Sequence, residues 1–251
     1  MVSKKNSVLE TDHTCPNGIP RSPVTMTKTW LPLEANPDLL TEYCRNLGLP
    51  DFIQFHDVLG AEDWALEMIP HPVKAIVLLY PLGNEEDTHT SVGFGSTGGV
   101  FFMKQIVENA CGTIAVLHEM ANLHVQGKLS FSEDSYVKRM LDAVCDTSPQ
   151  QRGEWLEADP EIEKAHASFQ TEGQSAMLSG DVDTHFIAFV PSMDGSRVIE
   201  LDGRKPGPID HGPIDLSNEI DPFGSAVLHV VTNQFINKNP EDIRFSILAL
   251  S

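Results

Sequence analysis

Runs of hydrophobic residues along the chain predict a mixture of strands and helices. "VKAIVLLYPL" at 73–82 is apolar at successive positions, which is typical of a central strand covered on both faces. "FIQFHDVL" at 52–59 and "RFSILAL" at 244–250 predict two further strands. The apolar block 100–123 ends in a segment with hydrophobic residues all round, and this predicts a buried helix.

Capping signals place the other helices. Asn36 is a predicted N-cap, Pro37 follows at the first helical position, and Gly48 stands where the helix should end. Three helical segments follow the buried helix and are predicted to begin at Ser130, Ser148 and Asp159. A last helix is expected at about 216–237.

Turn and loop signals complete the outline. "HFIAFVPSMDGSRVIELDG" at 185–203 predicts a hairpin whose turn is Asp194-Gly195. Polar stretches at 83–99 and 168–184 predict surface loops, the second long enough to be functional. Residues 1–28 are polar and aperiodic and are expected to form a flexible extension, which leaves one α/β (α+β) domain at 29–251.

Charge and cysteine content limit the function. The 251 residues include 36 acidic and 17 basic side chains, and a net charge of -19 disfavours nucleic acid and favours cationic partners. Four widely spaced cysteines without a CxxC pair indicate a reducing compartment. The absence of a secretory signal and an apolar run too short for a bilayer predict no membrane association. We therefore expect a cytoplasmic monomer, with the nucleus left open.

Two familiar patterns do not fit their usual functions. His118 and His124 are six residues apart, so on a helix their rings point in different directions and no metal site is expected. "GFGSTG" at 93–98 matches a dinucleotide-binding fingerprint, with Glu119 near the spacing of a ribose-binding acid. However, polar residues separate it from the preceding strand and Glu119 falls inside a helix, so no cofactor is expected. A nucleotide-binding oxidoreductase stays as an alternative hypothesis.

Cys111 in "ENACGTIAVLHEMANL" is either a small core residue or a nucleophile. With Asn109 as N-cap it would lie in the first turn of the buried helix, where unpaired N–H groups lower the pKa of a thiol. Whether Asn109 leaves the Cys111 N–H free is open at this point. Gln105, six residues earlier, is either a surface side chain or an oxyanion donor.

His185 and Asp202 supply a possible base and its orienting acid. With a two-residue turn, Asp202 lies opposite Ile187 and on the same face as His185. A three-residue turn would place them on opposite faces. The alternative is that the two residues only end their strands.

Four blocks together resemble the ubiquitin C-terminal hydrolase family, the papain-like cysteine deubiquitinases. They are "WLPLEANP" at 30–37, "FFMKQIVENACGTIAVLHEMAN" at 101–122, "HFIAFV" at 185–190 and "ELDGRKPGPIDHG" at 200–212. The resemblance implies a papain-like fold with a central, mostly antiparallel sheet flanked by helices, a knotted backbone, and 168–184 as a loop crossing the active site.

The resemblance also implies roles for individual residues. Cys111 would be the nucleophile, His185 the general base, Asp202 its orienting partner and Gln105 the oxyanion donor. The substrate would be ubiquitin or a ubiquitin-like modifier, contacted by Leu33, Glu34, Asp57 and Asp242. A catalytically silent ubiquitin-binding module is the second rival, although all four chemical residues are present.

Overall fold

The computed structural model describes residues 28–82, 99–170, 183–217, 219–238 and 240–251. Outside these ranges lie the "GFGSTG" motif, nearly all of the 83–99 loop and most of the 168–184 loop. Residues 1–27 also lie outside them, so the extent of the N-terminal extension stays a prediction. In chain order the elements are α1 (Pro37–Leu47), β1 (Phe55–Asp57), η1 (Asp63–Met68), β2 (Ala75–Pro81), α2 (Cys111–Val125), α3 (Tyr136–Val144), α4 (Pro149–Ala158), α5 (Pro160–Gln170), β3 (Thr184–Pro191), β4 (Arg197–Leu201), β5 (Ile209–Pro213), α6 (Pro222–Gln234), η2 (Ile236–Lys238) and β6 (Ser246–Leu250).

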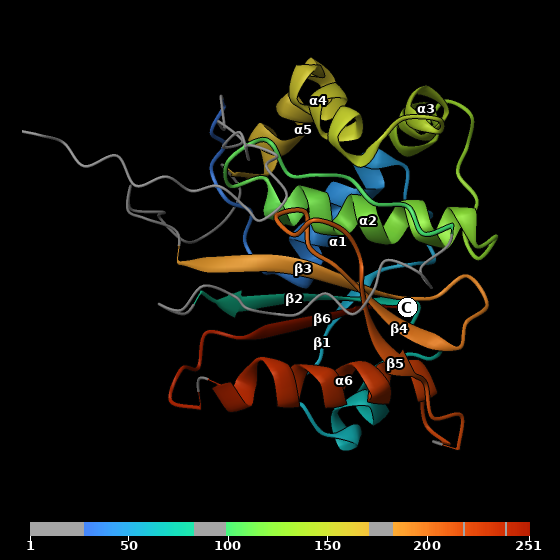
Figure 1. Cartoon of the computed structure of the whole chain (residues 1–251), viewed down its shortest axis with the longest axis vertical. Helices are drawn as coiled ribbons and strands as arrows, with labels where there is room; N and C mark the ends of the chain where they lie inside the picture. Colours follow the sequence, from blue (N-terminus) through green and yellow to red (C-terminus); the bar gives the residue numbers. More distant parts are fainter. Residues whose placement is uncertain (1–27, 83–98, 171–182, 218, 239) are drawn as a thin grey trace, which may run out of the picture.

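A six-stranded sheet in the order β1-β6-β2-β3-β4-β5 forms the centre of the fold, and every neighbouring pair is antiparallel. Helices α1 to α5 lie on one side of the sheet, and α6 lies on the other (Figure 1). The α+β class with an antiparallel sheet flanked by helices is thus confirmed. The knotted backbone path stays a prediction.

The central strand β2 contributes to two apolar layers. Ala75 and Val77 pack in the layer that holds α2, whereas Ile76 and Leu78 pack in the layer that holds α6. Both faces of β2 are therefore removed from water, which explains its unbroken apolar run. α2 is itself buried from Cys111 to Leu123, as its all-round hydrophobicity predicted.

The strongest capping signals are confirmed. The Asn36 side chain accepts hydrogen bonds from the N–H groups of Asp38 and Leu39, and Gly48 ends α1 with a φ of 117°. Ser148 and Gln151 form a reciprocal capping box at the start of α4.

Other boundaries were predicted wrongly. Ser130 does not cap a helix, because α3 begins only after Ser135, whose hydroxyl accepts from the Lys138 N–H. The last helix begins at Pro222 rather than near 216, with Asp221 as its cap. The strand expected at 52–59 is only three residues long, and α5 continues through 168–170, which were assigned to a loop.

Candidate active site

Cys111 is the first residue of α2 and is buried. The predicted cap is wrong: Ala110 occupies the N-cap position, and no side chain caps the helix. Asn109 instead has a φ of 61°, a left-handed conformation that asparagine tolerates, and its Nδ2 donates to the Trp30 carbonyl at 3.1 Å. The N–H groups around Cys111 are consequently not taken up by a capping side chain, which favours an anion at this helix end.

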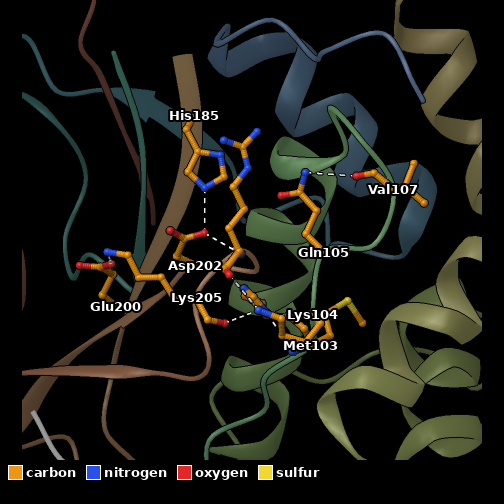
Figure 2. Close-up of polar contacts among 10 residues, drawn as sticks. Met103, Lys104, Gln105, Val107, His185, Glu200, Asp202 and Lys205 are labelled. Atoms are coloured by element: carbon orange, nitrogen blue, oxygen red, sulfur yellow. Dashed lines mark hydrogen bonds and ion pairs between the residues drawn. The ribbon is translucent and has the colours of Figure 1, made fainter. Parts of the chain in front are cut away.

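His185 and Asp202 form a buried pair (Figure 2). The distance from His185 Nε2 to Asp202 Oδ1 is 2.8 Å, and the Arg204 N–H donates to the same oxygen at 2.9 Å. Since the carboxylate only accepts, Nε2 carries the proton. Nδ1 has no nitrogen or oxygen partner among the described residues, which leaves it for the Cys111 thiol.

The register of the hairpin explains why the pair meets. Ladder pairs run from Pro191 opposite Val198 to Ala188 opposite Leu201, and one step further places Ile187 opposite Asp202. The connection is longer than the predicted two residues, because the Ser192 N–H still bonds the Arg197 carbonyl and four residues, 193–196, lie between. The extra loop residues are added one on each side of the turn, so the predicted register, with Ile187 opposite Asp202, is confirmed.

Local charges shift the pKa values of all three groups. Burial raises the pKa of Cys111, but the hydrogen bond and charge of His185, with smaller contributions from the Phe186 N–H and Arg204, outweigh it and lower the pKa below 9.0. Burial lowers the pKa of His185, but Asp202 and then Cys111 raise it to about 9. Burial would raise the pKa of Asp202, yet His185 above all lowers it to about 2. The shifts of Cys111 and His185 both favour transfer of the thiol proton to His185, so the arrangement promotes the thiolate–imidazolium pair.

Gln105 is buried on the segment before α2, which packs beside Asp202. Its Nε2 donates to the Val107 carbonyl at 3.1 Å (Figure 2), and its backbone N–H donates to the Gly203 carbonyl at 2.9 Å. An amide nitrogen carries two hydrogens, so one remains for a further acceptor. The surface alternative for Gln105 is excluded by its burial.

The four predicted substrate contacts are distributed unevenly. Leu33 packs beside the nucleophile, since a Cβ added to Gly112 would lie 3.2 Å from the Leu33 Cβ. Glu34 follows it, and its Oε2 is buried without a partner among the described residues. Asp57 ends β1 at the edge of the sheet, three strands from β3.

Asp242 belongs to a separate exposed network. Its carboxylate pairs with the Arg244 guanidinium at 2.7 Å, and Arg244 also contacts Asp183, two residues before His185. Leu33 and Glu34 thus adjoin the nucleophile, Asp242 is linked to the start of β3, and Asp57 lies apart.

A buried chain of hydrogen bonds near the nucleophile was not predicted. The Tyr43 hydroxyl lies 2.9 Å from the Thr113 hydroxyl, which lies 2.8 Å from His166 Nδ1, and His166 Nε2 lies 2.6 Å from the Leu31 carbonyl. Because a carbonyl only accepts, Nε2 donates to Leu31, Thr113 donates to Nδ1, and Tyr43 donates to Thr113. Burial lowers the pKa of His166 to about 4, so this neutral tautomer persists at neutral pH.

That chain links the first turn of α2 to the segment that precedes Leu33. Its members are separated by up to 135 positions in the sequence, and no local pattern connects them. Only the adjacency of Thr113 to Cys111 within one helical turn could have drawn attention to it.

Within the described residues, no cluster of three or more His, Cys, Asp or Glu side chains could hold a metal ion. His118 Nε2 faces the backbone of Met103, and Glu119 is buried in α2. No helix in these ranges is long and apolar enough to cross a membrane.

Comparison with known proteins gives a consistent result. Residues 30–237 match the family model described as ubiquitin carboxyl-terminal hydrolase, family 1. Ubiquitin carboxyl-terminal hydrolase 3 of Arabidopsis thaliana is 38% identical over 233 residues, covering 90% of this chain and 95% of that protein. The Drosophila melanogaster ubiquitin carboxyl-terminal hydrolase is 35% identical over 232 residues, covering 89% and 97%.

Among solved structures, the catalytic domain of Trichinella spiralis UCH37 bound to ubiquitin vinyl methyl ester has a TM-score of 0.72 to this fold. The two chains are 21% identical, and the match covers 92% of this chain and 99% of the other. At that identity the similarity concerns the fold alone.

Proposed function

The chain belongs to family 1 of the ubiquitin carboxyl-terminal hydrolases, and from this premise we propose that it hydrolyses the bond after the C-terminal glycine of ubiquitin, with Cys111 as nucleophile. It is a thiol-dependent deubiquitinase. The observation that carries the assignment of residues is the buried Cys111–His185–Asp202 arrangement, with His185 Nε2 bonded to Asp202 and Cys111 at the N-terminus of a helix.

Acylation uses the charges that the site already holds. The Cys111 thiolate attacks the glycine carbonyl, and the new oxyanion accepts hydrogen bonds from the free Nε2 hydrogen of Gln105 and the Cys111 N–H. The leaving amine takes its proton from the His185 imidazolium as the C–N bond breaks. The products of this step are the free amine and a thioester.

Deacylation reverses the role of His185. The neutral imidazole accepts a proton from a water molecule that attacks the thioester, and the C–S bond breaks to return the thiolate. Ubiquitin leaves with a free carboxylate, and His185 is again protonated. Asp202 keeps Nε2 protonated and the ring in place throughout both steps.

Substrate binding follows from acidic and apolar groups near the thiol. Leu33 packs at the first turn of α2, and the unpartnered Glu34 carboxylate oxygen is suited to a cationic group in the tail of the substrate. The net charge of -19 favours encounter with a basic partner. Contacts from Asp57 and Asp242 belong to the same proposal, at greater distance from the thiol.

Turnover of a ubiquitin C-terminal fluorogenic amide tests this function. The wild-type protein should release the fluorophore, Cys111→Ala should not, and Cys145→Ala should match the wild type because Cys145 is an exposed cysteine on another element. A ubiquitin with a C-terminal electrophile should form a covalent adduct only when Cys111 is present. Absence of both turnover and adduct in the wild type would refute the enzyme assignment and favour a silent binding module.

A further inference from the structure

The acid of the site sits on a short turn, residues 202–205, directly after β4. Within the turn, the Arg204 N–H donates to the Asp202 carboxylate at 2.9 Å and the Lys205 N–H donates to the Asp202 carbonyl at 3.0 Å. Arg204 also contributes to the lowered pKa of Cys111. The position of this turn therefore affects both the acid and the thiol.

Lys104 holds the turn from the helical side of the sheet (Figure 2). Its ammonium donates to the Arg204 carbonyl at 2.9 Å and to the Lys205 carbonyl at 2.5 Å. The Lys104 backbone is anchored on α4: its N–H donates to the Pro149 carbonyl, and its own carbonyl lies so close to Gly153 that an added Cβ would be 2.3 Å away. Lys104 thus connects α4 to the turn.

The neighbouring residue is the oxyanion donor. Gln105 bonds the Gly203 carbonyl through its backbone N–H, and a Cβ on Gly203 would approach the Gln105 Cβ to 2.9 Å. The segment 104–105 therefore makes three hydrogen bonds to 203–205 at van der Waals contact. Gln105 acts on the oxyanion and Asp202 acts on His185, and these hydrogen bonds fix the position of one relative to the other.

A second set of charges holds the turn from its opposite side. Glu200, buried on β4, accepts from the Lys205 ammonium at 2.9 Å and lies 2.7 Å from His211 Nε2 on β5. Lys205 therefore cannot move toward α2 to compensate for a lost contact without leaving a buried carboxylate. Beside the backbone N–H of Gln105, the Lys104 side chain is what ties the turn to the oxyanion segment.

We propose that Lys104 is a positioning residue that locks the Asp202 turn to the Gln105 segment, so that the oxyanion donor and the acid behind His185 keep one fixed separation. This inference rests on the function proposed above. Catalytic groups need to be held within about 0.5 Å of their productive positions, and two charge-assisted hydrogen bonds to backbone carbonyls supply that restraint. Without the ammonium, both carbonyls would accept hydrogen bonds from water instead, and residues 202–205 would shift.

The test compares Lys104→Met with Lys74→Met. Methionine keeps the length of the side chain and removes the donor. Lys74 is a half-buried lysine beside Ala75, at the opposite end of β2 from Tyr80, the residue paired with His185, so the control removes the same charge far from the site. Active enzyme is counted by adduct formation with electrophilic ubiquitin, so that loss of folded protein does not enter the rate.

Per titrated site, Lys104→Met should lower kcat about tenfold or more with less than about a threefold change in KM. In a Gln105→Ala background the same substitution should lower kcat by only about threefold, since part of its effect acts through Gln105. Lys74→Met should match the wild type, and Lys104→Arg, which keeps a cationic donor, should recover part of the loss.

Wild-type kcat in Lys104→Met would overturn the proposal, as would an equal loss in Lys74→Met. If Lys104→Met yields no folded protein, Gly203→Ala applies the same test by pushing the turn away from Gln105, and wild-type kcat in that variant also overturns it. An inactive wild type would instead refute the proposed function, so the two failures are distinguishable.

Discussion

Replacing Glu119 by methionine should stabilise the protein, by an amount that grows as the pH rises. Glu119 lies in the middle of α2 with no exposed surface, and neither carboxylate oxygen has a hydrogen-bond partner among the described residues. Burial alone raises its pKa well above the ordinary value of 4.5. The folded protein therefore carries a protonated, uncharged Glu119 at pH values where the unfolded chain has released the proton.

The sign and size follow from proton linkage. Above pH 4.5 the unfolded state binds fewer protons than the folded state, so stability falls with rising pH by up to about 1.4 kcal/mol per unit, until the pH passes the pKa of the folded state. Each unit by which the folded-state pKa exceeds 4.5 thus costs up to about 1.4 kcal/mol, against the 5–15 kcal/mol that holds a typical domain together. Methionine at this position has a similar volume and no proton to lose.

Urea unfolding at pH 5, 6, 7 and 8, under reducing conditions, measures the effect. The stability difference between Glu119→Met and wild type should widen as the pH rises, until the pH passes the pKa of Glu119 in the folded protein. The stability of Glu119→Gln should also lose its dependence on pH. It should be about 1–3 kcal/mol lower than that of Glu119→Met, because the buried amide lacks hydrogen-bond partners. Glu42→Gln, on the exposed side of α1, should keep the wild-type slope. A difference between Glu119→Met and wild type that stays constant from pH 5 to pH 8 would refute the reasoning.

Three other outcomes are expected. Asp202→Asn should move the alkaline limb of kcat/KM from about pH 9 to lower pH, because Asp202 raises the pKa of the His185 imidazolium that protonates the leaving group; an unmoved limb between pH 6 and 10 would contradict this. Thr113→Val should lower the free energy of unfolding in urea by about 1–3 kcal/mol and raise KM, because His166 Nδ1 loses its hydrogen-bond donor and the segment before Leu33 is less restrained. Tyr43→Phe should also lower stability, but with a smaller change in KM. Raising salt from about 0.05 M to about 0.5 M should lower kcat/KM for ubiquitin but leave single-turnover chemistry unchanged, because screening weakens steering by the acidic surface; equal second-order rate constants would exclude steering.

The parts of the fold predicted correctly are those with strong local signals. β2 and α2 were predicted because each is apolar on all sides. α1 and α4 were predicted because their capping residues lie next to the helix in the sequence. The pairing of His185 with Asp202 depended on the register of the hairpin, which was predicted correctly although the loop is two residues longer than expected. α6 was placed too early although Asp221-Pro222 repeats the signal used correctly at Asp159-Pro160.

The parts missed depend on contacts between distant segments. Asn109 has the residue type of an N-cap, but its amide is taken by the Trp30 carbonyl, 79 positions away. Nothing in the local sequence distinguishes Lys104 from a surface lysine, because its partners, Arg204 and Lys205, lie 100 and 101 positions further on. Periodicity and spacing along one segment carry no information about such pairs, so they emerge only when the segments are placed together.

The strand order also has a consequence for how the protein folds. β1 pairs with β6 at Phe55 and Leu250, and β6 pairs with β2 at Ala75 and Leu250, so the two earliest strands are joined through a strand about 170 or more positions later. Contacts of such long sequence separation slow folding, because loop-closure entropy is lost before the pairing is gained. Until residues 246–250 arrive, the backbone edge of β2 that pairs with β6 stays open to other chains. The joining of β1 to the rest of this sheet therefore waits for the strand made last among those described.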